Sequence, residues 1–454
     1  MIKSAFPKTH FEGHFIPLGL LYIAAYMKNE KDYNVKILDM LTARDYNKLD
    51  DTLKIFNPDL VGITSYTYEL FGLSYLCKYI KNYNPKIHIN LGGPHLTLYP
   101  DETLKLPFVD SITIGDGEIA FTKLAEALNI NQIPVDIPGI WFKNNNQYIK
   151  NNSPAIIKNL DSLPFPDRSF LPQQYYSATA HREYPFTTIV GSRGCPYKCI
   201  FCTMSTSIYR YRSPSNLADE VEMLSKQGYK YLDFVEGTFN VSKKWVSNVC
   251  NEFISRNLTI KWLINGRVDI IDDDICNLLK KAGCDKIEFG VESFAPNNLD
   301  FIKKRINIKQ IEDSFYLANK YGIKTNADFI IGFPEETIKD IKDTVKYAIK
   351  LNPNYARFCI LTPVPKTELY QWMIDKGYFK RDYFQEYALN PSEDFAVIHC
   401  SNILTFQQLA KITKWSYRKF YLRIGKIYEI LFETKTLKEF FNKIRSAIRL
   451  LLNI

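Results

Sequence analysis

The sequence has no long hydrophobic run. No stretch approaches the ~18 uninterrupted apolar residues that a membrane-spanning helix needs, so no transmembrane span is expected. Residues 1–17 lack a basic start followed by an apolar segment, and we therefore expect no export signal. With 46% hydrophobic and 24% charged residues, the composition excludes a disordered or fibrous chain.

Cysteine is scarce and odd in number. Nine cysteines make a complete disulfide framework improbable. In a chain without an export signal, such cysteines are expected to be reduced thiols or metal ligands. The sequence therefore predicts a cytoplasmic protein.

Acidic residues are few at the C-terminal end. Residues 411–454 hold eleven Lys or Arg against three Glu, which accounts for +8 of the net charge of +9. The rest of the chain is close to neutral. This distribution does not favour nucleic-acid binding over the whole surface.

The first part of the chain alternates short apolar runs with helical patterns. Strands are predicted at Val35–Asp39, Leu60–Thr64, Ile87–Leu91 and Ser111–Ile114. Helices are predicted at Leu18–Lys28, Tyr68–Asn82 and Ile119–Leu128. This alternation predicts an α/β fold for residues 1–142, with a Rossmann-like, doubly wound parallel sheet. Ligands of such sheets bind at the carboxyl ends of the strands.

A second alternating series follows a polar, proline-punctuated linker at residues 143–184. Its predicted strands are Thr187–Gly191, Tyr231–Val235, Lys261–Asn265, Lys286–Glu292, Asn326–Ile331 and Tyr355–Leu361. Its predicted helices are Asn216–Gln227, Ser242–Arg256, Asp272–Ala282, Lys309–Tyr321 and Thr337–Leu351. Six β/α units predict a partial (β/α)6 TIM-type barrel over residues 185–376, followed by a helical, basic C-terminal region, 377–454.

Three thiols lie close together directly after the first barrel strand. Cys195, Cys199 and Cys202 fall within eight residues, and thiolate clusters favour zinc or iron–sulfur. A zinc site would need a fourth ligand, such as the distant His181 or another cysteine. Three ligands on a cubane cluster would leave one iron open for substrate.

The spacing Cys-x3-Cys-x-Phe-Cys after a first barrel strand resembles the radical S-adenosylmethionine (SAM) superfamily. Other segments resemble the subgroup with an N-terminal cobalamin-binding domain, and together they cover roughly residues 15–375. These segments are Pro17–Leu20, Gly92–His95, Gly115–Glu118, Ser192–Cys195, Tyr211–Pro214, Gly332–Thr337 and Thr362–Pro365.

The resemblance implies a 4Fe-4S cluster, SAM and cobalamin as cofactors. A reduced cluster of this family cleaves SAM and releases a 5′-deoxyadenosyl radical, while the protein orients the reactants. A low-potential electron donor such as a flavodoxin or ferredoxin is then expected. The substrate is expected to be a small or lipid-like molecule.

The resemblance also implies roles for single residues. Cys195, Cys199 and Cys202 would ligate the cluster. Five further residues would bind SAM: Phe201 beside the adenine, Glu236 at the methionyl amine, Arg267 at the carboxylate, and Glu292 and Ser293 at the ribose.

For cobalamin, the chain lacks the Asp-x-His-x-x-Gly segment that supplies an axial His. The cobalt is therefore expected to have no protein His ligand, and His95 has no axial role. The residues expected to contact cobalamin are Thr64, Ser65, Thr67, Gly92, Gly93, Gly115 and Glu118. A vestigial or purely structural first domain is the alternative.

Methyl transfer to an unactivated carbon is the predicted outcome. Radical rearrangement, cyclisation or ring contraction on the same scaffold is one alternative. A non-catalytic Fe–S electron carrier or sensor is another, from a different class of protein.

The basic tail has an amphipathic pattern. Apolar residues recur mostly at steps of three and four at Leu437, Phe440, Phe441, Ile444, Ile448, Leu451 and Leu452. The pattern predicts a helix that docks on the barrel, contacts a membrane surface peripherally, or offers a positive platform to an acidic electron donor.

Overall fold

The computed structural model describes residues 15–31, 33–40, 46–145, 147–152, 154–172, 176, 185–393, 395 and 398–432. The chain divides into two compact units. The first is Met1–Ala178 with Lys380–Ala396, and the second is Thr179–Phe379 with Val397–Ile454. Residues 380–396 therefore belong to the first unit, although the sequence grouped them with the C-terminal region.

The first unit is built on a five-stranded sheet in the order β1-β2-β3-β4-β5. The strands are β1 (Leu60–Thr64), β2 (His88–Gly92), β3 (Ser111–Thr113), β4 (Ile140–Asn144) and β5 (Gln147–Lys150). The first three are parallel, whereas β4 and β5 continue the sheet as an antiparallel hairpin. This hairpin extends past residue 142, where the sequence predicted the start of a linker.

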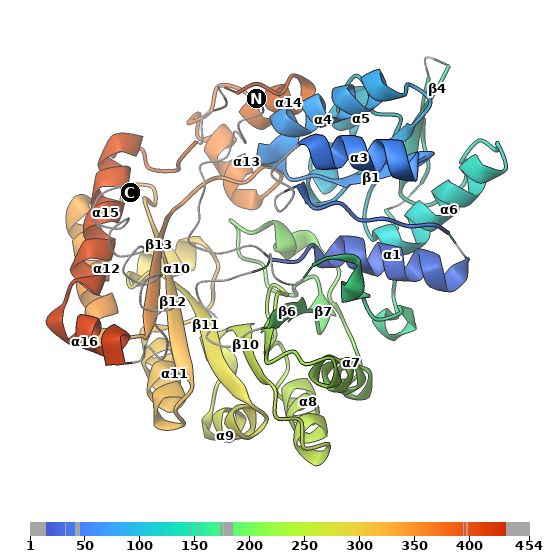
Figure 1. Ribbon diagram of the computed structural model, residues 1–454. Coiled ribbons are helices and arrows are strands. Elements are labelled where there is room, and N and C mark those ends of the chain that lie inside the picture. The colour runs from blue at the N-terminus through green and yellow to red at the C-terminus, as the bar shows by residue number, and fades with distance from the viewer. Residues whose placement is uncertain are drawn as a thin grey trace. The chain divides into compact units, whose positions relative to one another are not determined.

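Helices cover both faces of this sheet (Figure 1). They are α1 (Leu18–Glu30), α3 (Tyr46–Phe56), α4 (Leu70–Tyr83), α5 (Pro100–Lys105) and α6 (Gly117–Asn129). One apolar cluster joins α3, α4 and α5 to β2 through side chains such as Leu53, Cys77 and Leu91. A second joins α6 to β4 through Leu124 and Ile140. The predicted fold class is confirmed for this unit.

One predicted strand is wrong. Residues 35–39 form no strand, and their side chains stay half-buried or exposed. The segment has the apolar composition of a strand, but a strand also needs a neighbour to accept and donate its backbone hydrogen bonds. No described strand pairs with it, because β1 pairs only with β2.

The late helix α14 (Tyr383–Leu389) packs within the first unit. The Tyr99 hydroxyl donates to Asp382 at 2.9 Å, and the Phe71 N–H donates to the Tyr387 hydroxyl at 3.2 Å. Phe384 is fully buried there. These contacts join residues about 300 positions apart, and no local sequence pattern reveals such pairs.

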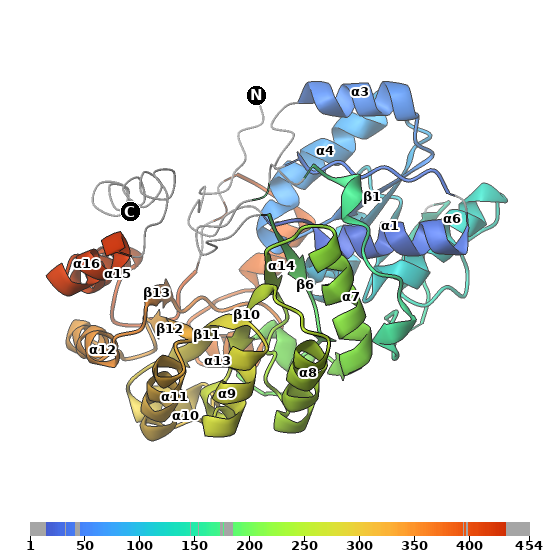
Figure 2. The same ribbon diagram turned by 60° about the horizontal axis from the view of Figure 1, so that its bottom comes forward.

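The second unit is a partial barrel of six parallel strands that neighbour one another in chain order (Figure 2). They are β6 (Phe186–Ile189), β9 (Tyr231–Phe234), β10 (Lys261–Gly266), β11 (Cys284–Glu292), β12 (Lys324–Ile331) and β13 (Tyr355–Ile360). All six predicted barrel strands are present, so the predicted partial barrel is confirmed.

Helices follow the barrel strands along the chain. They are α7 (Pro214–Lys226), α8 (Lys243–Ser255), α9 (Asp273–Lys281), α10 (Pro296–Phe301), α11 (Ile308–Lys320), α12 (Ile338–Leu351) and α13 (Glu368–Asp375). Six of them begin at a polar residue whose side chain accepts a backbone N–H of the first turn: Ser213, Ser242, Asp272, Asn307, Thr337 and Thr367. Their apolar faces join the strands in one core around Trp262 and Phe289.

The barrel ends at β13 because side chains occupy its outer edge. The Phe358 N–H donates to the Tyr417 hydroxyl at 3.1 Å, and the Ala356 N–H donates to the Tyr421 hydroxyl at 2.9 Å. Both tyrosines belong to α15 (Phe406–Tyr421), which α16 (Ile424–Phe432) follows. Edge strands expose unpaired backbone groups, and these hydroxyls satisfy three of them, since Tyr421 also donates to the Ala356 carbonyl at 2.9 Å. Within the described ranges, no helix has the length and apolar character to cross a bilayer.

Candidate functional site

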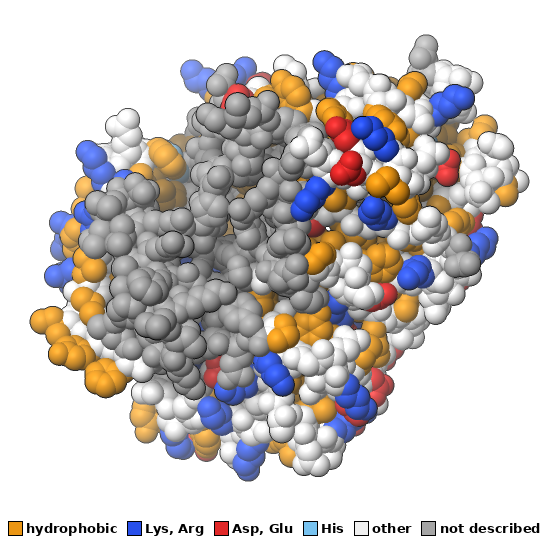
Figure 3. Space-filling view, viewed as in Figure 1, with side chains coloured by type: hydrophobic (Ala, Val, Ile, Leu, Met, Phe, Trp, Pro, Cys, Tyr) orange, Lys and Arg blue, Asp and Glu red, His pale blue; other side chains and the backbone are white. Residues whose placement is uncertain are grey.

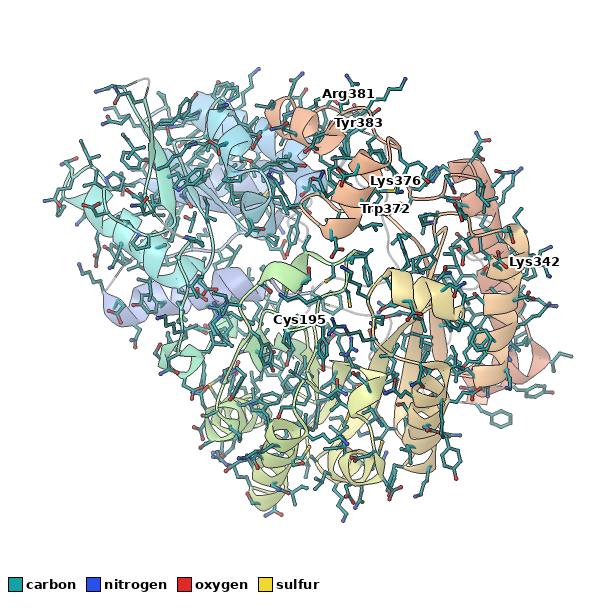
Figure 4. All side chains as sticks on the ribbon, turned by 180° about the vertical axis from the view of Figure 1, so that it is seen from behind. Cys195, Lys342, Trp372, Lys376, Arg381 and Tyr383 are labelled. Carbon is teal, nitrogen blue, oxygen red and sulfur yellow. The ribbon has the colours of Figure 1, made fainter. Side chains whose placement is uncertain are left out.

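The three clustered thiols lie in a loop between two short antiparallel strands, β7 (Ser192–Arg193) and β8 (Arg210–Tyr211). Gly194 has φ +81°, and a Cβ there would lie 2.2 Å from the Ile208 carbonyl oxygen, so only glycine fits. The loop is also tied to distant segments through Ile200. Its N–H donates to the Ile302 carbonyl at 3.2 Å, and its carbonyl accepts from Leu369 at 2.9 Å. The thiol loop, in which Figure 4 labels Cys195, is therefore anchored to the segments that contain Ile302 and Leu369.

The thiols are unbridged and shielded. Cys195 and Cys199 are buried, and Cys202 is half-buried. Burial raises the pKa of Cys199, and the nearby Lys304 and Arg267 cations act against that rise. Cys202 also has a raised pKa, again from burial, with Cys199 and Cys195 adding to it. Negative charge on Cys195 thus raises the pKa of both Cys199 and Cys202.

In the described part of the chain, no group of three or more His, Cys, Asp or Glu side chains is arranged so that it could hold a metal ion. The assignment of Cys195, Cys199 and Cys202 as ligands therefore stays a prediction. The zinc alternative gains no fourth ligand from Cys250, which is buried in the barrel core. His181 lies outside the described residues. Phe201 is half-buried in the thiol loop.

Glu236 follows β9 and is buried next to the thiol loop. Its Oε1 accepts the Gly191 N–H at 3.3 Å, whereas its Oε2 is buried without a hydrogen-bond partner. Burial raises its pKa to about 8. Its neighbour Gly237 faces Cys195, and the Thr238 hydroxyl lies 3.8 Å from the Cys195 sulfur. An unpaired carboxylate oxygen in such a place is costly unless a cationic group or a proton meets it.

The guanidinium group of Arg267 already binds a carboxylate of the protein. Its Nε and Nη2 donate to the two carboxylate oxygens of Asp269 at 2.9 and 3.0 Å. The guanidinium also lies 3.7 Å from the centre of the Tyr197 ring, and its Nη2 donates to the Lys304 carbonyl at 2.9 Å. The sequence predicted that this fork holds the SAM carboxylate, but in the structure Asp269, two residues further on, occupies it.

Glu292 and Ser293 end β11 in a buried polar network. Glu292 has φ +64°, and its Oε1 accepts from Lys304 Nζ at 2.6 Å. The Ser293 hydroxyl accepts the Ala295 N–H at 3.1 Å and the Asn298 amide at 3.2 Å. Both side chains already have protein partners. A ribose at this place would therefore compete with these contacts or add to them.

Sequence reasoning missed two buried members of this network. Lys304 belongs to a Lys-Lys-Arg run typical of a solvated surface, yet it is only 8% exposed. Glu336 accepts the Gly332 and Phe333 N–H groups at 2.6 and 3.2 Å, and burial raises its pKa to about 7. The sequence offers adjacent glutamates here, and only the fold buries the second of them.

The predicted cobalamin residues of β1 and β2 do lie at the carboxyl edge of the parallel strands. The Ser65 hydroxyl and N–H both donate to the Gly92 carbonyl, at 2.7 and 2.8 Å. Gly93 has φ +97°, and a Cβ there would lie 2.7–2.8 Å from Thr64 and Ser65. At Gly92, by contrast, a Cβ would meet nothing within 4 Å. Gly92 is therefore the place where the backbone lies open to a ligand.

His95 is fully buried, and both ring nitrogens are engaged. Nδ1 lies 3.1 Å from the Thr67 hydroxyl, and Nε2 lies 2.9 Å from the Thr103 hydroxyl. Thr103 donates its proton to the Tyr99 carbonyl, so it accepts from Nε2–H. Burial lowers the pKa of His95 to about 4. This neutral histidine links Thr67 to Thr103 of α5 through hydrogen bonds. Its two ring nitrogens are therefore unavailable to a metal.

Gly115 and Glu118 have local roles in the structure. Gly115 has φ +96°, and a Cβ there would lie 2.2 Å from the Ala155 carbonyl oxygen. Its glycine is therefore explained by the bridge between Gly115 and Ala155. Glu118 is buried in the first turn of α6, where a helix favours negative charge.

Comparisons with known proteins agree with this arrangement. The radical SAM superfamily model matches residues 189–348, and the B12 binding domain model matches residues 7–125. An uncharacterized methyltransferase of Pyrococcus horikoshii, PH0819, is 33% identical over 426 residues, which cover 92% of this chain and 90% of that protein. This chain belongs to the radical SAM enzymes with an N-terminal B12-binding domain.

Two further relatives extend the comparison. The anaerobic magnesium-protoporphyrin IX monomethyl ester cyclase of Rubrivivax gelatinosus is 30% identical, covering 80% of this chain and 67% of that enzyme. The radical SAM methyltransferase TsrM from Kitasatospora setae has a TM-score of 0.69 at 19% identity, covering 81% of this chain and 73% of that one. The TsrM structure holds cobalamin and a [4Fe-4S] cluster. The family, the fold class and the radical SAM enzyme class predicted from the sequence are confirmed.

Proposed function

We propose that this radical SAM enzyme is a cobalamin-dependent methyltransferase acting on an unactivated carbon. The observation that carries the proposal is the unpaired, buried Oε2 of Glu236 beside the thiol loop. The methyl-transfer outcome is supported by the 33% identity to a methyltransferase over nine-tenths of both chains.

The thiol loop suits an iron–sulfur cluster. Cys195, Cys199 and Cys202 would bind three irons and leave one open. The buried cations Lys304 and Arg267 would offset part of the negative charge that three thiolates bring into this shielded place. When bound, the cluster with SAM supplies one-electron chemistry that activates a carbon–hydrogen bond.

Glu236 suits the methionyl amine of SAM. An ammonium group at Oε2 would satisfy the buried oxygen and add a charge-assisted hydrogen bond. Glu292 and Ser293 stand at the end of β11 for the ribose, and Phe201 offers an aromatic face. Arg267, paired with Asp269, would support the site through its contact with the Tyr197 ring.

The carboxyl edge of β1, β2 and β3 suits the nucleotide tail of cobalamin. The backbone at Gly92 has open space beside it, and Gly93 lets Thr64 and Ser65 pack closely against the chain. The Thr67 hydroxyl is positioned by its hydrogen bond with His95. Gly115 and Glu118 would complete the edge from β3 and α6. Because His95 is neutral and both its ring nitrogens are engaged, His95 would not serve as a ligand of the cobalt.

We expect the two reaction products of SAM to report the function. Methylation through cobalamin consumes one SAM as methyl donor and one as radical source. S-adenosylhomocysteine and 5′-deoxyadenosine should therefore accumulate in equal amounts with methylated product, as chromatography with mass spectrometry measures. Deoxyadenosine alone would contradict methyl transfer. It would favour the alternative of rearrangement or cyclisation. The 30% identity to a cyclase supports that alternative.

The two adjacent glycines give a matched pair of variants. Gly92→Val should leave the melting temperature nearly unchanged, because open space surrounds Gly92, yet weaken hydroxocobalamin binding by roughly tenfold or more through loss of close backbone approach. Gly93→Ala should instead destabilise the first unit, by more than about 1 kcal/mol, because of its positive φ and the clash with Ser65. Thermal unfolding and absorbance titration measure both. Unchanged cobalamin binding by Gly92→Val would remove this edge from the proposal.

Related properties follow the same proposal. The thiol-held cluster supports a cytoplasmic setting in which thiols stay reduced, with a flavodoxin or ferredoxin as electron donor. The non-catalytic carrier alternative predicts a redox-active cluster that leaves SAM intact. Cobalamin would bind to the domain formed by residues 1–142, and the radical SAM chemistry would take place in the barrel formed by residues 185–376.

A further inference from the structure

The last described helix, α16, exposes apolar side chains and buries a charged one. Several of its apolar side chains point outward: Ile424, Tyr428 and Phe432, spaced by four residues, are 77%, 60% and 84% exposed. Ile427, one step of three after Ile424, is also exposed. We call these four residues the α16 stripe. Figure 3 shows hydrophobic side chains gathered where α16 lies in Figure 1, at the lower left.

The polar face of α16 is the face that holds it to the barrel. Lys426 is buried, and its Nζ donates to the Pro353 carbonyl at 2.8 Å and to Glu429 at 2.6 Å. Glu429 also accepts from the Asn354 amide at 3.0 Å. The helix is therefore fixed with its apolar stripe outward, and the stripe is not a consequence of fraying.

The surface around the stripe is basic. The preceding helix α15 has no acidic residue and carries the exposed cations Lys411, Arg418 and Lys419. Glu429, the single acid of α16, is neutralised by its contact with Lys426. Residues 433–454, with the amphipathic pattern predicted above, lie outside the described residues; their sequence contains five Lys or Arg and two Glu.

We propose that the α16 stripe and the basic residues around it dock on the surface of an anionic lipid bilayer. Isoleucine, tyrosine and phenylalanine beside Lys and Arg are the residues by which interfacial helices bind lipid headgroups. A second copy of the chain fits less well, since four side chains fall short of the roughly 800 Å² per partner of a standard interface. The net positive tail fits less well too, because it would bring like charge onto a basic surface.

The test uses the full-length protein and extruded vesicles of phosphatidylcholine with phosphatidylglycerol. Wild-type protein should sediment with these vesicles and roughly tenfold less with phosphatidylcholine alone, since Lys and Arg near an anionic surface are attracted to its headgroups. The variant Ile424→Ser/Tyr428→Ser/Phe432→Ser should bind roughly tenfold or more weakly. Because all three side chains are exposed, the variant should keep its melting temperature.

A matched control is Ile55→Ser/Ile130→Ser/Tyr316→Ser, which removes side chains that are 81%, 59% and 70% exposed elsewhere. It should sediment like the wild type. Absence of wild-type sedimentation, unchanged sedimentation of the α16 variant, or equal loss in the control would each overturn the proposal. So would a concentration-dependent dimer in analytical ultracentrifugation that the α16 variant abolishes while vesicle binding persists.

Discussion

Replacing Cys199 with Ser should remove the iron–sulfur chromophore and SAM cleavage together. Cys199 is buried at the centre of the thiol loop, and a serine hydroxyl is a far poorer iron ligand than a thiolate. With only two thiols left, the loop should not retain a cubane. Iron and labile sulfide analysis after anaerobic reconstitution, the visible absorption spectrum and the yield of 5′-deoxyadenosine should all fall to background.

The matched control is Cys359→Ser. Cys359 is an exposed thiol on β13, outside the thiol loop, so its loss should leave iron content and cleavage unchanged. Cleavage retained by the Cys199 variant would refute the ligand assignment. Tetrahedral zinc in the wild-type loop, without iron or sulfide, would refute the whole functional proposal.

The second large effect is expected from Glu236→Gln. At a pH near 8 the variant should bind SAM about 10- to 100-fold more weakly, because hydrogen bonds to charged groups contribute about 1.5–3 kcal/mol. Isothermal titration calorimetry measures this without turnover. Glu335→Gln is the control, since that glutamate is exposed on the same barrel and should leave SAM affinity unchanged.

The pH dependence has a definite sign. Burial places the pKa of Glu236 at about 8 in the folded chain, above its ordinary value of 4.5. The free enzyme therefore holds a proton at neutral pH that an ammonium ligand must displace. Between about pH 6 and 7.5, where an α-amino group is still largely protonated, SAM affinity should rise with pH by up to about tenfold per unit. The Gln variant should lack this rise.

The same shift affects stability without ligand. Between pH 4.5 and about 8 the folded chain binds a proton that the unfolded chain has lost, so wild-type stability should fall as pH rises through this range. Near pH 8 and above, Glu236→Gln should therefore melt at a higher temperature than the wild type. Weaker SAM binding with a higher melting temperature is a pair of results that a merely structural glutamate would not give.

The sequence by itself determined the features that contiguous residues encode. The spacing of Cys195, Cys199 and Cys202, the apolar periods of the six barrel strands and the Gly92–His95 segment are all local, and they were sufficient for the family and the fold class. The missing strand at 35–39 shows the limit of this reasoning, because pairing requires a neighbour that a local pattern does not provide.

Only the tertiary structure decided the environment of single side chains. It buried Lys304 against Glu292, left one oxygen of Glu236 without a partner, and turned the apolar stripe of α16 outward. It also showed that residues 380–396 belong to the first unit. Burial and hydrogen bonding depend on residues that meet from far apart in the chain, and their free energies are set only when those residues are together.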